Sequence, residues 1–170
     1  MKNIKTKELV YLGLFISLEV ILTRFLSIQT PIVRIGFTFI PVAISAIMFG
    51  PLFSGTAAAL ADVIGMVLFP TGAYFPGFTL SAFLSGVIYG VLLHDKTITI
   101  MRISLAVIII SILINLGMDT VWLWLLTKKA FVLLLPARMI KCTALVPVQI
   151  LTIQIIWKLA LCRIKFSYGN

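Results

Sequence analysis

The chain has 170 residues, of which 61% are hydrophobic and only 11% are charged. An ordinary soluble domain has about 25% charged and about 45–50% apolar residues, so this composition excludes one. Each membrane-spanning helix uses roughly 20 apolar residues, so about six spans fill the length and leave no room for a soluble catalytic or DNA-binding domain within it. The formal net charge of +9 fits membrane topology, anionic lipid or an anionic ligand better than nucleic acid.

Continuous apolar runs predict six membrane-spanning helices, because a helix satisfies all of its backbone hydrogen bonds within one segment in lipid. The predicted spans, in chain order, cover residues 9–28, 37–49, 52–69, 78–93, about 98–126 and about 133–161. Segments with Pro and Gly or polar turns separate the spans, at 29–36, 50–51, 70–77, 94–97 and 128–129. The second run is short, and the last two runs are longer than a bilayer requires. The fold prediction is therefore an all-α membrane protein that forms one domain over residues 1–170.

Basic residues at the start of the chain predict a cytoplasmic N-terminus. Lys2, Lys5 and Lys7 precede the first span, and positively charged flanks stay in the cytoplasm. Six spans then return the C-terminus to the same side. In this orientation eight of the fourteen basic residues are cytoplasmic, which is a weak bias. The other six fall at the outer ends of the spans: Arg24, Arg34, Lys128, Lys129, Arg138 and Lys141.

The cations at the outer ends are the informative feature, because the positive-inside rule does not favour them there. Arg138 and Lys141 are three residues apart and share one helix face. Arg24 lies near the end of the first span, and Arg34 lies in the connection after it. Arginine forms bidentate hydrogen bonds with a carboxylate and lysine supplies a point charge, so these residues predict an anion site. The alternative is that they reach outward to lipid head groups.

Acidic residues inside spans are costly to bury and are usually functional. Asp62 and Asp119 lie inside spans, where each could pair with an arginine or accept hydrogen bonds from the ring nitrogens of a ligand. Glu19 also lies inside a span, and its role stays open. Aromatic residues at the same level form either an interfacial belt or walls for a flat heterocycle: Tyr74, Phe75, Phe78, Trp122 and Trp124. Cations, acids and aromatic faces together favour a flat anionic ligand.

Motifs for nucleotide binding, nucleophilic catalysis and metal binding are absent from the sequence. It contains no G-x-x-x-x-G-K-[ST], no G-x-S-x-G and no H-E-x-x-H. The single histidine, His94, lies in a turn assigned to the cytoplasm. We therefore expect no cofactor, no metal ion and no catalytic residue, and an energy supply from a partner protein.

Small residues four positions apart lie on one helix face and let helices approach closely. Such a face serves either packing inside the bundle or contact with a partner protein. Gly13 and Ser17 form one pair, and the other sets are Gly55 with Ala59, Ala57 with Ala61, and Ala82 with Gly86 and Gly90.

Several segments together resemble the folate-specific S components of energy-coupling factor (ECF) transporters. The most specific segment is 75–83 (FPGFTLSAF), and the likeness covers essentially the whole chain. The other segments are 24–28 (RFLSI), 31–37 (PIVRIGF), 49–51 (FGP), 69–72 (FPTG) and 135–138 (LPAR) with Lys141. Two positions depart from the family pattern. Gly13-x-x-x-Ser17 stands where an Ala-x-x-x-Ala stripe is common, and Asp119-Thr120 stands in place of Asn-Thr.

The resemblance implies a six-helix substrate-capture subunit with both termini in the cytoplasm. Such subunits bind a vitamin at the outer face, under the loops between helices one and two, three and four, and five and six. They work with a transmembrane coupling protein and two cytoplasmic ATPases, and the whole subunit is thought to topple in the membrane. On this basis Gly13 and Ser17 are the candidate interface with the coupling protein.

The functional prediction is capture of folate, a pterin–glutamate vitamin, at the outer face of a bacterial cell membrane. Arg24, Arg34, Arg138 or Lys141 would hold the glutamate carboxylates, and the pterin would lie between aromatic rings with an acid or Asn115 at its edge. Three alternatives stay open: an S component for another vitamin, a small membrane enzyme acting on lipid phosphates, and a self-sufficient carrier or structural subunit. The candidate ligand-binding residues are Arg24, Arg34, Asp62, Tyr74, Phe75, Phe78, Ser81, Asn115, Asp119, Trp122, Arg138 and Lys141.

Overall fold

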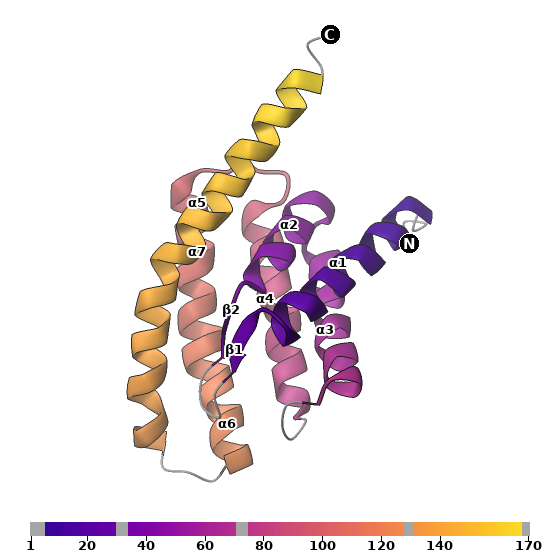
Figure 1. The fold of residues 1–170 in the computed structure, drawn as a ribbon. Helices are drawn as coiled ribbons and strands as arrows, with labels where there is room; N and C mark the ends of the chain where they lie inside the picture. The colour runs from indigo at the N-terminus through magenta and orange to yellow at the C-terminus, as the bar shows by residue number, and fades with distance from the viewer. Residues whose placement is uncertain (1–5, 30–33, 71–74, 128–130, 168–170) are drawn as a thin grey trace.

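Helices joined by short connections, with one two-stranded hairpin, make up the fold (Figure 1). The computed structural model describes residues 6–29, 34–70, 75–127 and 131–167. The elements are α1 (Thr6–Arg24), β1 (Ser27–Gln29), β2 (Arg34–Gly36), α2 (Phe39–Phe49), α3 (Pro51–Leu68), α4 (Pro76–Leu93), α5 (Ile100–Ile109), η1 (Ile110–Met118), α6 (Asp119–Thr127) and α7 (Phe131–Ser167). α5, η1 and α6 follow one another without a break and form one helical column.

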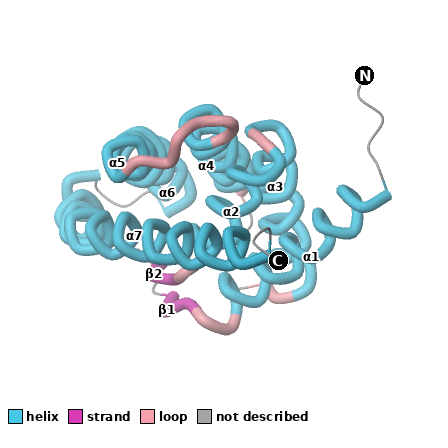
Figure 2. The backbone as a smooth tube through the Cα atoms, turned by 90° about the horizontal axis from the view of Figure 1, so that it is seen from above, coloured by secondary structure: helices cyan, strands magenta, loops and turns pink. Residues whose placement is uncertain are grey.

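The helices form two layers around an apolar core. Seen along the bundle, α3, α4 and α5 lie side by side, and α7 lies on the other side of α2 (Figure 2). Phe39, Tyr89 and Val107 are among the buried residues of the core between these helices. α1 packs on α3, where Ile16 and Val20 join a second apolar cluster. The C-terminal part of α7 extends past the rest of the bundle (Figure 1).

Among the residues that the structure describes, four helical segments are long and apolar enough to cross a membrane: Pro51–Leu68, Pro76–Leu93, Ile100–Leu126 and Arg138–Lys158. They match the predicted third to sixth spans closely. α1 covers residues 9–24 of the predicted first span, but it also includes Lys7, Glu8 and Glu19, which lower its hydropathy. α2 has only 11 residues, or about 16 Å at 1.5 Å per residue, so it is too short to cross a bilayer by itself. The prediction of a helical membrane protein is confirmed.

The predicted loop over 29–36 contains strand residues at both of its described ends, Gln29 in β1 and Arg34–Gly36 in β2. β1 and β2 pair antiparallel, with Ser27 opposite Gly36 and Gln29 opposite Arg34. The first helix therefore ends at Arg24 instead of at residue 28. Gly36 packs directly on Ser27, because a Cβ at Gly36 would lie only 2.6 Å from the Ser27 Cβ. The hairpin follows Arg24 closely and lies against the last turn of α1, where a Cβ at Gly36 would lie 3.8 Å from the Leu22 carbonyl oxygen.

α3 and α4 approach so closely that backbone touches backbone. A Cβ at Gly86 would lie 2.6 Å from the Ser54 carbonyl oxygen, and a Cβ at Gly90 would lie 2.2 Å from the Pro51 Cα. A Cβ at Gly55 would also meet the opposite helix. Only glycine allows these contacts, so the small residues of α3 and α4 serve packing inside the bundle.

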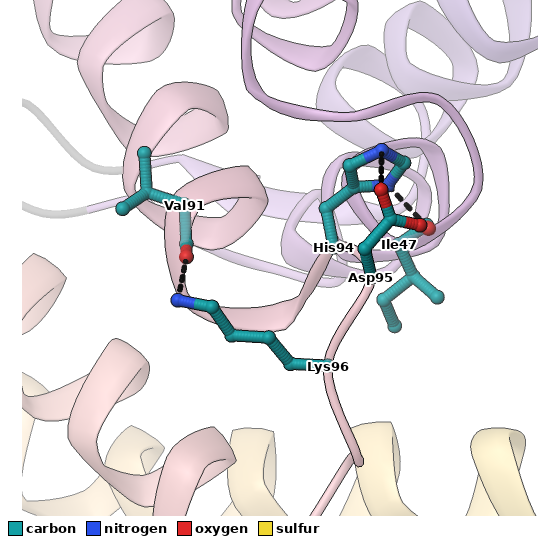
Figure 3. A network of polar contacts seen from close by, with 5 residues as sticks. All are labelled: Ile47, Val91, His94, Asp95 and Lys96. Carbon is teal, nitrogen blue, oxygen red and sulfur yellow. Dashed lines mark hydrogen bonds and ion pairs between the residues drawn. The ribbon is translucent and has the colours of Figure 1, made fainter.

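A histidine joins two connections at one end of the bundle (Figure 3). Gly50 links α2 to α3 with φ of +89°, a conformation that glycine adopts without strain. The His94 ring lies 3.1 Å from the position of a Cβ built on Gly50, and its Nδ1 donates to the Ile47 carbonyl at 3.0 Å. Its Nε2 lies 3.2 Å from Oδ2 of Asp95. The Lys96 ammonium donates at 2.8 Å to a carbonyl in the last turn of α4, where a cation also stabilises the helix dipole.

The predicted fifth span contains a π-helical stretch, η1, of nine residues. At its end the Asp119 N–H bonds to the carbonyl of Ile114, five residues earlier. Each extra residue in such a turn rotates the following side chains by about 100° relative to an uninterrupted α-helix. π turns inside α-helices are frequent at functional sites. This stretch therefore sets the direction in which α6 presents its side chains.

Candidate ligand-binding site

The predicted site residues gather at the end of the bundle opposite His94, where α3 ends and α4 begins. The guanidinium of Arg24, the last residue of α1, lies here against Gly65 of α3. A Cβ at Gly65 would lie 2.9 Å from the Arg24 Nε and 3.2 Å from Nη2, and both nitrogens are shielded from solvent. The missing side chain at Gly65 thus makes the space that Arg24 fills. Arg24 is turned into the bundle and not toward lipid.

Two acidic side chains, from α1 and α3, lie near each other at this end of the bundle. Asp62 precedes Gly65 by three residues on α3, and its Oδ2 accepts a hydrogen bond of 2.8 Å from the Thr79 hydroxyl of α4. Glu19 of α1 is only 5% exposed, and it is near enough to Asp62 for the two carboxyl groups to interact electrostatically. Ionisable side chains inside a membrane bundle are expensive and are usually functional. Glu19, Arg24, Asp62 and Thr79, from α1, α3 and α4, form the first group of polar residues at this end.

Aromatic side chains from α4 and α6 form a second group at this end. The ring centroids of Phe75 and Trp122 are 5.5 Å apart, and those of Phe75 and Phe78 are 6.3 Å apart with an edge-on geometry. The Trp122 indole N–H donates to the Ser81 hydroxyl at 3.2 Å. Gly77 allows this packing, because a Cβ there would lie 2.5 Å from the Trp122 ring. We call Phe75, Phe78, Ser81 and Trp122 the aromatic cluster.

Arg138 of α7 forms a third group with the junction between η1 and α6. Its Nη1 donates to the Asn115 carbonyl at 2.8 Å and lies 3.4 Å from the Thr120 hydroxyl. Arg138 is 9% exposed, and Thr120 is completely buried. Asp119 begins α6 and is near enough to Arg138 to interact with it electrostatically. Arg138 therefore also points into the bundle and not toward lipid.

The structure gives fewer contacts for the remaining predicted ligand-binding and interface residues. Asn115 and Lys141 are half-buried, and Lys141 lies one turn after Arg138 on α7. Arg34 begins β2, where its backbone pairs with Gln29. Tyr74 lies outside the described residues. Gly13 and Ser17 are exposed on α1, and a Cβ at Gly13 would meet no other atom within 4 Å.

Three polar residues of these clusters were not among the predicted ligand-binding residues: Glu19, Thr79 and Thr120. Thr79 lies in the FPGFTLSAF segment two positions before Ser81, and Thr120 follows Asp119 directly. A threonine inside a span is weak evidence by itself, because its hydroxyl often bonds to its own helix backbone. Their partners on other helices are visible only in the folded structure.

The arrangement can bind a ligand but offers no obvious reactive group. Guanidinium groups, carboxyl groups and aromatic faces provide charge, hydrogen bonds and stacking for a flat molecule. Within residues 6–29, 34–70, 75–127 and 131–167, no group of three or more His, Cys, Asp and Glu side chains could hold a metal ion. The side chains of these three groups are therefore suited to binding a ligand.

The family model described as the substrate-specific component of ECF transporters matches residues 7–162, which is most of the chain. The protein belongs to this family. The resemblance carried by the sequence motifs is thus confirmed, and the protein is an S component, a multi-pass protein of the cell membrane.

Two curated relatives match most of the chain in sequence. The chain is 52% identical over 155 residues to the folate transporter FolT of Clostridium novyi, covering 91% of this chain and 90% of the relative. It is 32% identical over 155 residues to the folate transporter FolT of Leuconostoc mesenteroides, covering 87% of this chain and 83% of that protein.

Two solved structures have the same fold. The crystal structure of FolT bound with folic acid superposes with a TM-score of 0.82 at 39% identity, covering 86% of this chain and 89% of that chain. The S component of a bacterial ECF transporter superposes with a TM-score of 0.67 at 17% identity, covering 96% of this chain and 98% of that chain. The second likeness is one of fold alone.

Proposed function

We propose that this S component captures folate and delivers it across the membrane together with an ATP-driven ECF module. The observation that carries the proposal is the match to a FolT structure that holds folic acid, at a TM-score of 0.82 and 39% identity. The identity of 52% to a folate transporter over 91% of the chain supports the same ligand. The three groups of site residues supply side chains that suit a pterin joined to a glutamate.

The two ends of folate require different chemistry. The aromatic cluster offers Phe75, Phe78 and Trp122 for stacking on the pterin ring. The ring nitrogens and the amino group of the pterin suit acceptors such as the carboxylates of Asp62 and Asp119, with Ser81 and Asn115 at the edge. The glutamate carboxylates suit Arg24, Arg34 and Lys141, and Tyr74 would line the entrance from the 70–77 connection. Arginine can hold a carboxylate with two parallel hydrogen bonds.

The membrane topology that goes with this function has six helices and two cytoplasmic termini in a single domain over residues 1–170. The hairpin, the 70–77 connection and the 128–130 connection would then lie on the outer side, and the His94 turn on the inner side. In this role the protein binds and carries its ligand without transforming it, and needs no cofactor. Its energy comes from a transmembrane coupling protein and two ATPase subunits.

A ligand panel tests the proposed function directly. Purified protein should bind folic acid in calorimetric titration with one site, and should not bind riboflavin or pantothenate. Because binding to the folded state alone stabilises it, folic acid at a hundredfold excess over its Kd should add about 2.7 kcal/mol to the free energy of unfolding. Preferential binding of another vitamin would contradict the folate assignment, and turnover of a lipid phosphate would contradict the transport role.

The exposed pair Gly13 and Ser17 on α1 supports a contact face for the coupling protein. No other part of the described bundle covers Gly13, since nothing lies within 4 Å of a Cβ built there. Small residues favour close helix contact in membranes. Gly13→Leu should therefore lower folate uptake by cells about tenfold or more, while calorimetric binding of folic acid to the purified subunit persists. The loss of about 1.4 kcal/mol of association energy is enough for that factor.

Val67→Leu serves as the control for this experiment. Like Gly13→Leu, this substitution enlarges an exposed side chain. Val67 is 75% exposed and lies on α3, outside the proposed interface on α1. Uptake by the Val67→Leu strain should equal that of the wild type. Full uptake by the Gly13→Leu strain would place the coupling interface elsewhere.

A further inference from the structure

Arg138 reaches the junction where the π-helical stretch η1 ends and α6 begins. In an uninterrupted α-helix the Asp119 N–H would bond to the Asn115 carbonyl. Here it bonds to the carbonyl of Ile114 instead. The Asn115 carbonyl receives the Arg138 Nη1 at 2.8 Å. The π turn thus takes the Asp119 N–H away from the Asn115 carbonyl, and the Arg138 side chain of α7 donates a hydrogen bond to that carbonyl in its place.

The same guanidinium also contacts the first turn of α6. Its Nη1 lies 3.4 Å from the hydroxyl of Thr120, a residue with no exposed surface. Arg138 therefore bonds on both sides of the junction between η1 and α6. A second contact from α7 supports it one turn further on, where the Cys142 thiol lies 3.9 Å from the Ser111 carbonyl near the start of η1. α7 holds the π stretch at both of its ends.

The direction of α6 determines where two proposed ligand contacts lie. Asp119 and Trp122 are the first and fourth residues of α6. Trp122 joins the aromatic cluster through Ser81 and Phe75. A change at the junction would rotate α6 and withdraw Trp122 from both partners. The Arg138 side chain is thus connected to the aromatic cluster through the backbone of α6.

The environment of Arg138 favours this internal role. The residue is 9% exposed, so water competes little for its hydrogen bonds, and its Nε has no hydrogen-bond partner among the residues that the structure describes. Hydrogen bonds from a charged donor to a buried carbonyl are among the stronger ones in proteins. A carboxylate that drew Nη1 away from the Asn115 carbonyl would break this bond.

We propose that Arg138 is a positioning residue, which fixes the junction between η1 and α6 and thereby places Trp122 and Asp119 for the ligand, instead of binding a glutamate carboxylate itself. The inference rests on the proposed folate function. It differs from a carboxylate-binding role in a measurable way, because a positioning residue affects every ligand that uses the aromatic cluster. A carboxylate-binding residue affects only ligands that carry the glutamate.

The test compares folic acid with pteroic acid, which has the pterin and benzoate but lacks the glutamate. Arg138→Met removes the donor at similar length, and we expect it to weaken the binding of both compounds by the same factor, about tenfold or more. The ratio of the two Kd values should stay as in the wild type. Arg138→Lys, which keeps a donor, should restore part of the loss for both compounds, and it replaces Arg138→Met if that variant does not fold.

A spectroscopic measurement on ligand-free protein accompanies the binding assay. In a background with Trp124→Phe and Trp157→Phe, Trp122 is the single tryptophan, and its emission reports on the environment of the aromatic cluster. Arg138→Met should shift this emission, and Thr120→Val should shift it in the same direction by less. Arg102→Met, which removes an exposed arginine from α5, is the matched control and should change neither emission nor affinity.

The outcomes separate the two roles of Arg138. Loss of folic acid binding with unchanged pteroic acid binding would overturn the inference and assign Arg138 to the glutamate. Unchanged Trp122 emission together with unchanged affinities would overturn it as well. If the wild type binds neither compound, the folate function fails, and the Trp122 emission of the ligand-free variants still decides the role of Arg138.

Discussion

Gly65→Ala should leave the bundle folded but weaken folic acid binding strongly. The new methyl group would lie 2.9 Å from the Arg24 Nε, which is closer than a carbon–nitrogen contact allows, so the guanidinium must move. The displaced group is the end of a flexible side chain, so the cost in stability is small. A hydrogen bond between ionised partners contributes about 1.5–3 kcal/mol, so the affinity should fall roughly 10- to 150-fold. Calorimetric titration with folic acid measures this loss.

A double-mutant cycle shows whether the loss acts through Arg24. Arg24→Ala should weaken binding at least as much as Gly65→Ala, and the double variant should be no weaker than Arg24→Ala alone, because both changes remove one interaction. Val67→Ala, at a position 75% exposed on the same helix, should bind as the wild type does. Additive losses in the double variant would show that Gly65 and Arg24 act independently.

Gly90→Ala should destabilise the protein much more than Gly65→Ala does. A Cβ at this position would lie 2.2 Å from the Pro51 Cα and 2.5 Å from the Pro51 nitrogen. These are backbone atoms, so no rotation of a side chain relieves the clash and α3 must separate from α4. Overpacking in a well-packed interior costs about 1–3 kcal/mol and occasionally more, and we expect a loss of about 3 kcal/mol. Thermal unfolding of the purified protein in detergent measures it.

The neighbouring position provides the control for Gly90. Val91 is 53% exposed, and Val91→Ala should change the free energy of unfolding by no more than about 0.5 kcal/mol. Folic acid should raise the unfolding temperature of Val91→Ala, and of Gly90→Ala if it folds, since the Gly90–Pro51 contact lies at the end of the bundle away from the ligand. A Gly90→Ala protein as stable as the wild type would mean that α3 and α4 are farther apart than the structure has them.

Hydropathy located the helices well but could not detect two local departures. The apolar run continues from α1 through Phe25 and Leu26, so it shows no end at Arg24. The hairpin is present only as two short alternations, Ser-Ile-Gln in β1 and Arg-Ile-Gly in β2, which are too brief to predict strands or their pairing. The π stretch is invisible for a different reason. Its nine residues are mostly apolar, and Ser111 and Asn115 are too few to show where the helical phase shifts.

The sequence predicted the chemical types of the site residues better than their partners. Arg24 and Arg138 are distinctive because cations at the outer ends of spans need an explanation, and both indeed point inward. The space for Arg24 depends on an absent side chain at Gly65, and the contacts of Arg138 depend on a backbone carbonyl in η1. Neither a glycine nor a carbonyl can be selected from composition or spacing. The ligand contacts of Arg34 and Tyr74 remain predictions.

The glycine contacts between α3 and α4 have a mechanical consequence. Two backbones in direct contact have no intervening side chains that could slide or re-pack, so this pair of helices moves as one body. Asp62 and Thr79 belong to this body, whereas Arg24 is carried by α1. A ligand that touches Asp62 and Arg24 together fastens α1 to the α3–α4 body. Separating α1 from the α3–α4 body would break one of these two contacts and leave α3 and α4 joined.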